Sequence, residues 1–230
     1  MGLLIEGKWS TQWYDTKATQ GKFVRKESQF RHWITADGSA GITGDSGFKA
    51  QAGRYHLYVS LACPWAHRTL IFRALKGLEN MISVSVVNAF MGEQGWRFED
   101  GQGVVPDCVN EVSHVHQLYT LAQSDYSGRV TVPILWDKQR NMIVSNESAD
   151  IIRMFNSACN HLTGNEDDYY PQELQEKIDQ INDRGYEEIK NGVYRAGSAT
   201  TQPAYEAAYY QLGDALEWVE SILSRQRYLA

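Results

Sequence analysis

Short runs of β-branched and aromatic residues alternate with a helical pattern in the middle of this chain. Residues 55–60 and 82–87 each predict a strand, and an apolar stripe over residues 64–76 predicts a helix that Gly77 ends. A strand, a helix and a strand in such close succession predict a βαβ unit. The two strands are then parallel and joined by a right-handed crossover.

A third strand is predicted at residues 129–136, after a polar and irregular insertion at residues 89–128 that contains one short helix at 114–122. Pro133 lies inside this strand and lacks the N–H that a sheet ladder needs. Two interpretations stay open. Either residues 129–136 form an edge strand, or the Val132–Pro133 bond is cis and turns the chain there.

After the third strand, the sequence predicts one more strand and then only helices. Residues 142–144 predict a fourth, antiparallel strand, and residues 145–155 predict a helix. The last third of the chain is helical, with apolar residues at helical spacing in residues 172–191 and 205–225.

The order of these elements predicts two domains behind an N-terminal arm. A mixed sheet with a Cys-Pro-x-Ala turn after its first strand and Val-Pro entering its third is the thioredoxin-like plan. We therefore predict an α/β, thioredoxin-like domain at residues 51–162 and the start of an all-α domain at residues 170–230. Residues 1–50 carry irregularly spaced aromatic residues, and we expect this arm to pack across the surface of the rest of the chain.

Composition narrows the class of protein. The chain has 230 residues, of which 43% are hydrophobic, so it has enough apolar material for a sizeable core. A net charge of −6 argues against nucleic acid or an anionic membrane as a partner. No apolar run approaches the roughly 18 residues of a membrane span. Three scattered cysteines and no signal-peptide pattern predict a reducing, cytoplasmic location.

Cys63 is the strongest candidate for chemistry. It lies between a predicted strand and the start of a predicted helix, where unpaired N–H groups and the helix dipole favour a thiolate. His67 and Arg68, one turn later, add positive charge. Ala66 stands where a Cys-x-x-Cys motif has its second thiol, so disulfide chemistry at Cys63 requires an external thiol. The alternative is a buried structural cysteine.

A second group of candidates lies around the predicted helix start at residue 147. Glu147 suits an ammonium group, and Ser148 with the helix N–H groups suits a carboxylate, although plain N-capping by Ser145 or Asn146 explains the same residues. The backbone of Val132 offers strand-like contacts to a peptide. A thiolate, a peptide contact and a zwitterion clamp fit a small thiol peptide, of which glutathione is the obvious one. No spacing predicts a metal site.

With these residues, the sequence resembles the Xi-class glutathione transferases, the S-glutathionyl-hydroquinone reductases. The segment that carries the resemblance is Tyr58-Val59-Ser60-Leu61-Ala62-Cys63-Pro64-Trp65-Ala66-His67-Arg68-Thr69. Supporting blocks are residues 54–57, 88–96, 128–133, 143–148 and 191–197. The long aromatic arm is also typical of that class.

The resemblance implies a role for each matching residue. Cys63 is the nucleophile, and Tyr194 is the proton or hydrogen-bond donor in a neighbouring hydroquinone pocket. Glutathione is the co-substrate and no metal is needed. The implied glutathione-binding residues are Trp96, Arg129, Val130, Thr131, Val132, Glu147 and Ser148.

The resemblance also implies partners and a chain length. The expected partners are glutathione and aromatic glutathionyl conjugates, and the full-length family form is expected to be a homodimer. Members of the class continue beyond the position of Ala230 with further helices, so we expect only the first part of the helical domain here. Two other functions stay open: an omega-like thioltransferase or dehydroascorbate reductase, and a non-catalytic binding module.

Overall fold

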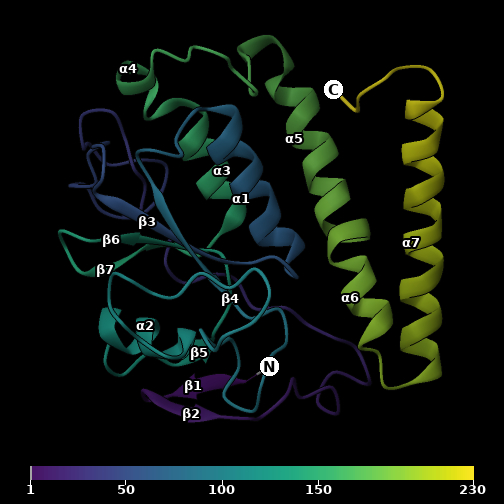
Figure 1. The fold of residues 1–230 in the computed structure, drawn as a ribbon. Helices are drawn as coiled ribbons and strands as arrows, with labels where there is room; N and C mark the ends of the chain where they lie inside the picture. Colours follow the sequence, from purple (N-terminus) through teal and green to yellow (C-terminus); the bar gives the residue numbers. More distant parts are fainter. Residues whose placement is uncertain (1) are drawn as a thin grey trace. The chain divides into compact units, whose positions relative to one another are not determined.

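The computed structural model describes residues 2–230, which form two compact units (Figure 1). The first unit contains the chain up to Trp13 together with Ser28–Tyr169. The second contains Tyr14–Glu27 together with Tyr170–Ala230. The N-terminal arm is therefore divided between the units.

A four-stranded mixed sheet organises the first unit, in the order β4-β3-β6-β7. β3 is parallel to β4 and antiparallel to β6, and β7 is antiparallel to β6. The bounds are β3 (Tyr55–Ser60), β4 (Ser83–Val87), β6 (Ile134–Asp137) and β7 (Met142–Ser145). All six residues of β3 are buried, as expected for a central strand. The predicted βαβ unit and antiparallel fourth strand are confirmed.

Helices α1 (Pro64–Leu75) and α3 (Ser148–Ser157) pack against each other beside this sheet (Figure 1). Pro64 is the first residue of α1, where its missing N–H costs no hydrogen bond. Gly77 follows the helix end with φ +65°, a conformation that glycine adopts without strain, so the predicted stop is confirmed. The shorter helices of this unit are α2 (Val115–Ala122) and α4 (Asn160–Thr163).

The predicted third strand at residues 129–136 is wrong as a single element. Its start, β5 (Gly128–Arg129), pairs in a second sheet of order β2-β1-β5 with β1 (Leu3–Ile5) and β2 (Lys8–Ser10). Its end is β6 in the main sheet. Between them the Val132–Pro133 peptide bond is cis, which decides between the two interpretations of Pro133. The chain changes sheets at this point instead of continuing along one edge.

The expectation that the arm packs across the surface is also wrong for its second half. Phe30, Ile34 and Phe48 are buried in the same hydrophobic core as the central strand. The His32 N–H donates to the Val144 carbonyl, 2.9 Å away, so this part of the arm also binds the edge strand β7. These residues contribute to the core of the first unit.

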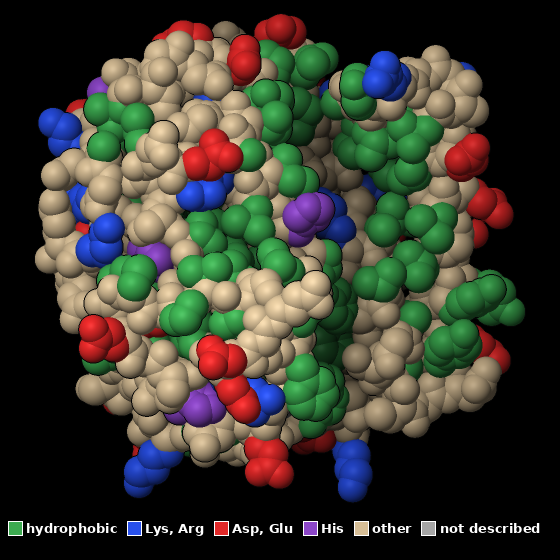
Figure 2. All heavy atoms as spheres, in the orientation of Figure 1, with side chains coloured by type: hydrophobic (Ala, Val, Ile, Leu, Met, Phe, Trp, Pro, Cys, Tyr) green, Lys and Arg blue, Asp and Glu red, His purple; other side chains and the backbone are tan. Residues whose placement is uncertain are grey.

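The second unit is helical, as predicted. The region predicted as one helix at 172–191 consists of a 3₁₀ turn, an α-helix and a π-helical segment: η1 (Gln172–Leu174), α5 (Gln175–Arg184) and η2 (Gly185–Lys190). α6 (Gly192–Gly197) and α7 (Gln202–Leu223) complete it. On α7, Ala208 and Ala215 are buried but Leu216 is exposed, and Figure 2 shows hydrophobic side chains on the surface there. The predicted apolar face is thus only partly covered.

The segment Tyr14–Glu27 binds the connection between α6 and α7 directly. The Thr200 N–H donates to the Gly21 carbonyl at 3.0 Å, and the Thr201 hydroxyl donates to the Gln20 carbonyl at 3.1 Å. Gly21 has φ +87°, and an added Cβ would lie 2.3 Å from the Thr201 hydroxyl oxygen. Glycine is therefore needed for this close approach. No helix described in residues 2–230 is long and apolar enough to cross a membrane.

His56, on the central strand, predicts a pH dependence of stability. Its ring is fully buried between the hydroxyls of Ser83 (2.6 Å from Nδ1) and Ser85 (2.9 Å from Nε2). The Ser85 hydroxyl donates to the Pro106 carbonyl, so it accepts a hydrogen bond from Nε2, which carries the proton in the neutral ring. Burial lowers the pKa of His56 from 6.5 to about 4.

The unfolded chain therefore binds this proton more readily than the folded chain between pH 6.5 and 4, so stability falls as the pH decreases through that range. We expect His56 to account for a loss of about 2 kcal/mol between pH 7 and pH 4.5. Urea unfolding at pH 7 and pH 4.5, compared between the parent and His56→Gln, measures it. A pH dependence equal in both proteins would contradict this origin.

Candidate active site at the start of two helices

Cys63 occupies the N-cap of α1, as predicted. Its backbone is extended (φ −100°, ψ 113°) and its side chain makes no capping hydrogen bond. The backbone N–H donates to the Ser60 carbonyl at 3.1 Å, which fixes the turn between β3 and α1. The thiol is partly exposed, and its Sγ lies 3.5 Å from the Val132 carbonyl oxygen. A buried, purely structural cysteine does not fit this position.

The segment before the cis bond brings Val132 to the thiol. The Tyr119 hydroxyl donates to the Thr131 carbonyl at 3.0 Å and accepts the Thr131 N–H at 3.2 Å. The Asn146 side-chain amide donates to the same hydroxyl at 3.1 Å. The backbone of Thr131 is thus bound within the protein, and Val132 is the residue that lies against Cys63.

Glu147 and Ser148 form a charged and polar cluster with Arg68 at the start of α3. Glu147 is the N-cap, and its Oε1 accepts the Ala149 N–H at 3.0 Å. Its Oε2 accepts the Ser28 hydroxyl at 3.0 Å. Arg68 on α1 donates to the Ser148 hydroxyl from Nε (3.1 Å) and Nη2 (2.7 Å), and its Nη2 lies 3.7 Å from Glu147 Oε1. Two helix starts are thereby joined at one site.

One sequence-based expectation about this cluster needs correction. Capping by Ser145 or Asn146 is wrong because the helix begins later: Ser145 lies at the end of β7, and its hydroxyl accepts the Glu147 N–H at 3.1 Å. Arg68 also has a role that the sequence did not indicate, because its guanidinium binds the Glu147–Ser148 pair; its effect on the charge at the thiol stays a prediction.

Three other candidate residues lie in or beside the core. Trp96 is 7% exposed and Val130 is 3% exposed, and both belong to the main hydrophobic cluster. Arg129 lies on β5, and its Nη1 donates to the Gln12 carbonyl at 2.8 Å. The glutathione-binding roles of these residues stay predictions.

Tyr194 belongs to α6 in the second unit, whereas Cys63 belongs to the first. The Arg25 guanidinium lies 4.6 Å from the centre of the Tyr194 ring, and Phe23 stacks with the ring at 6.3 Å. Two residues of the arm thus hold the orientation of this tyrosine. Its catalytic role stays a prediction.

Comparison with known proteins places this arrangement in a family. The model for the N-terminal domain of glutathione S-transferases matches residues 62–158. Over the whole chain, the sequence is 55% identical to the glutathionyl-hydroquinone reductase PcpF of Sphingobium chlorophenolicum and 56% identical to YqjG of Escherichia coli, spanning 70% of each relative. The chain belongs to the glutathione transferase family. It falls in the Xi class, among the glutathionyl-hydroquinone reductases.

Solved structures of Xi-class glutathione transferases agree with this assignment. The glutathione-bound structure of E. coli YqjG matches all of this chain and 69% of the YqjG chain, with a TM-score of 0.89 and 51% identity. The Xi transferase of Phanerochaete chrysosporium matches 90% of this chain and 69% of its own, with a TM-score of 0.85 and 48% identity. The predicted thioredoxin-like domain followed by a helical domain is confirmed.

Within this glutathione transferase, the sequence did not predict that Ser28 binds Glu147 or that Arg68 binds Ser148. Arg68 stands inside the motif that begins at Tyr58, so its position is visible, but its bond to Ser148 crosses 80 residues of sequence. Ser28 carries no signal, because it lies in an arm with no regular pattern and meets Glu147 over 119 residues. In the described residues 2–230, no group of three or more His, Cys, Asp or Glu side chains is placed to hold a metal ion.

Proposed function

We propose that this chain reduces S-glutathionyl-hydroquinones to hydroquinones, with glutathione as the second substrate and Cys63 as the nucleophile. Two relatives more than half identical to it are named glutathionyl-hydroquinone reductases. The observation that carries the mechanism is one partly exposed thiol at the start of α1, 3.5 Å from the Val132 carbonyl, with alanine at position 66. A thiol placed there has access to substrate, and Ala66 supplies no second thiol at the position of a Cys-x-x-Cys motif.

The reaction proceeds in two half-reactions. The Cys63 thiolate attacks the sulfur of the conjugate, the bond between that sulfur and the ring carbon breaks, and a Cys63–glutathione disulfide forms. The ring carbon takes a proton, which we assign to Tyr194. A second glutathione thiolate then attacks the mixed disulfide, and glutathione disulfide and the Cys63 thiolate leave. Two glutathione units are oxidised while the conjugate is reduced by two electrons.

The cluster on α3 binds the γ-glutamyl end of glutathione in this proposal. The Glu147 carboxylate receives the ammonium group, and the Ser148 hydroxyl with the first N–H groups of α3 receives the carboxylate. The Val132 backbone pairs with the peptide part, and Trp96, Arg129 and Val130 complete the site. The bonds from Ser28 and Arg68 hold Glu147 and Ser148 in place before glutathione arrives.

Mass spectrometry of the intact protein tests the proposal. With a glutathionyl-hydroquinone and no free glutathione, we expect one glutathione adduct per chain and one equivalent of released hydroquinone. A relative from Schizosaccharomyces pombe, 43% identical over 217 residues, is named glutathione S-transferase omega-like 2. Faster turnover of dehydroascorbate than of the conjugate would therefore favour an omega-like reductase. Neither an adduct nor turnover would favour a binding module.

Replacing Arg68 by methionine is expected to weaken glutathione binding more than it slows the chemistry. The variant removes two hydrogen bonds to Ser148 and the positive charge beside Glu147. A loss of about 1–3 kcal/mol in the free energy of glutathione binding corresponds to a roughly tenfold to hundredfold higher KM for glutathione. Steady-state kinetics with glutathione varied measure it.

Arg140→Met is the matched control, because Arg140 binds the Ser46 carbonyl and no residue of the cluster. Arg68→Lys should restore part of the affinity. An unchanged KM in Arg68→Met with normal folding would show that the cluster does not bind glutathione.

A further inference from the structure

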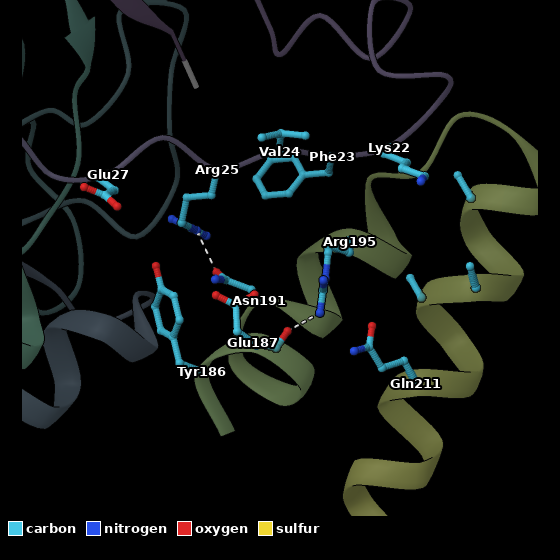
Figure 3. A pocket seen from close by; sticks show the side chains of 13 residues that line it. Lys22, Phe23, Val24, Arg25, Glu27, Tyr186, Glu187, Asn191, Arg195 and Gln211 are labelled. Atoms are coloured by element: carbon cyan, nitrogen blue, oxygen red, sulfur yellow. Dashed lines mark hydrogen bonds between the residues drawn. The ribbon is translucent and has the colours of Figure 1, made fainter. Parts of the chain in front are cut away.

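A cavity of about 440 Å³ lies entirely within the second unit (Figure 3). One wall is the arm segment from Lys22 to Glu27, and the others come from η2, α6 and α7. Small-molecule sites in proteins range from about 300 to 1,000 Å³. An enclosed space of about 150 Å³ already holds benzene. The cavity therefore has room for a ligand with two fused rings.

The two sides of the cavity differ in chemistry. The buried ring of Phe23 and three alanines of α7, Ala204, Ala207 and Ala208, give it an apolar surface. Short alanine side chains keep that surface flat, so a planar ring can lie against it. The cavity thus combines an apolar bed with a rim of charged side chains.

Positive charges outnumber negative ones around it. Lys22, Arg25 and Arg195 line the cavity together with Glu27 and Glu187, a formal balance of +1. Figure 3 shows Glu27 at one end, whereas Lys22 and Arg195 lie towards the other. An anionic group is therefore favoured at the end that lies away from Glu27.

Arg195 lines the cavity without a carboxylate partner among residues 2–230. One Nη of its guanidinium donates to the Glu187 backbone carbonyl, and its Nε is buried without a hydrogen-bond partner among residues 2–230. A guanidinium with unpaired N–H groups beside an apolar surface attracts a carboxylate strongly. A carboxylate can accept two parallel N–H bonds from arginine.

Arg25, unlike Arg195, is fixed by side chains of the cavity wall. Its Nε donates to Asn191 Oδ1 at 2.9 Å, and its guanidinium covers the Tyr194 ring at 4.6 Å. Asn191 is itself only 7% exposed, so this contact is a fixed part of the wall. Arg25 therefore shapes the cavity, and Arg195 is the group that recognises the anion.

We propose that this cavity binds a small aromatic carboxylate, with the carboxylate between Arg195 and Lys22 and the rings against Phe23 and the alanines of α7. The assignment does not depend on the glutathione chemistry proposed for Cys63. It concerns residues of the second unit alone.

Calorimetric titration with 2-naphthoate, in the absence of glutathione, tests the proposal. We expect saturable binding of one equivalent, at least tenfold weaker binding of the neutral 2-naphthamide, and at least tenfold weaker binding of 2-naphthoate to Arg195→Gln. Arg227→Gln is the control, because Arg227 lies next to the chain end, where it covers Tyr228, and does not line the cavity. The affinity of Arg227→Gln for 2-naphthoate should equal that of the parent.

A second variant keeps the test decisive if Arg195→Gln folds poorly. Ala207→Leu fills the apolar side while leaving both arginines in place, and leucine is well tolerated in a helix. It should abolish binding without changing the melting temperature by more than a few degrees. No saturable binding to the parent, equal affinity for the amide, or unchanged affinity in Ala207→Leu would each overturn the proposal.

Discussion

Cys63→Ser is expected to lower the rate of glutathionyl-hydroquinone reduction by at least about 1,000-fold. A serine hydroxyl cannot form the mixed disulfide, and Ala66 supplies no second thiol to replace it. The measurement is release of hydroquinone, followed by chromatography, together with the mass of the protein. The glutathione adduct should be absent from the variant.

Cys108→Ser is the matched control, because Cys108 is an exposed thiol in the same unit and lies outside the site. It should retain full activity and the adduct. A serine at position 63 is also expected to allow conjugation of glutathione to electrophiles, since a hydroxyl stabilises a glutathione thiolate without capturing it. Reduction at a normal rate by Cys63→Ser would show that Cys63 is not the nucleophile.

Arg54→Met is expected to destabilise the first unit by about 3–5 kcal/mol. The side chains of Arg54 and Asp137 are 6% and 0% exposed, and Arg54 Nε lies 3.0 and 3.1 Å from the two carboxylate oxygens of Asp137. Without Arg54, a carboxylate remains buried with only the N–H groups of Gln139 and Arg140. Urea unfolding followed by circular dichroism measures the loss.

Arg31→Met provides the comparison for this ion pair. Arg31 binds Asp150 in the same unit. The Asp150 side chain is 9% exposed, but that of Arg31 is 36% exposed, so water reaches the pair and replaces part of what is lost. We expect a loss of about 1 kcal/mol there. The double variant Arg54→Met, Asp137→Leu should be more stable than Arg54→Met alone, because it leaves no buried charge unpaired. Equal losses in the two single variants would contradict the role of burial.

Local patterns in the sequence predicted the elements whose causes are local. β3 and α1 were visible because a run of β-forming residues, a proline at a helix start and a glycine at its end each act within a few residues. The nucleophile candidate followed from the same turn. The resemblance of this segment to Xi-class transferases then extended the prediction to the whole architecture.

Features that depend on distant residues were missed or misplaced. Nothing near Phe48 indicates that its ring is fully buried in the core of the first unit. The predicted strand is interrupted before Pro133 because its start pairs in a second sheet. Gly128 and Arg129 pair there with β1, which lies more than 120 residues earlier in the sequence. At the start of α3, a serine of the arm binds the capping residue Glu147, and an arginine of α1 binds the next residue, Ser148. Patterns in a single sequence do not predict contacts between residues that are so far apart along the chain.

The burial of the arm has a consequence for how the first unit folds. The Phe30 carbonyl accepts the Asn146 N–H, and Arg31 binds Asp150, so these contacts close loops of 116 and 119 residues. Contacts of such long sequence separation form slowly, because chain entropy is lost before they return any stability. During synthesis, Phe30 and Arg31 leave the ribosome long before their partners near residue 150. We therefore expect the arm to be among the last parts of this unit to become protected from hydrogen exchange.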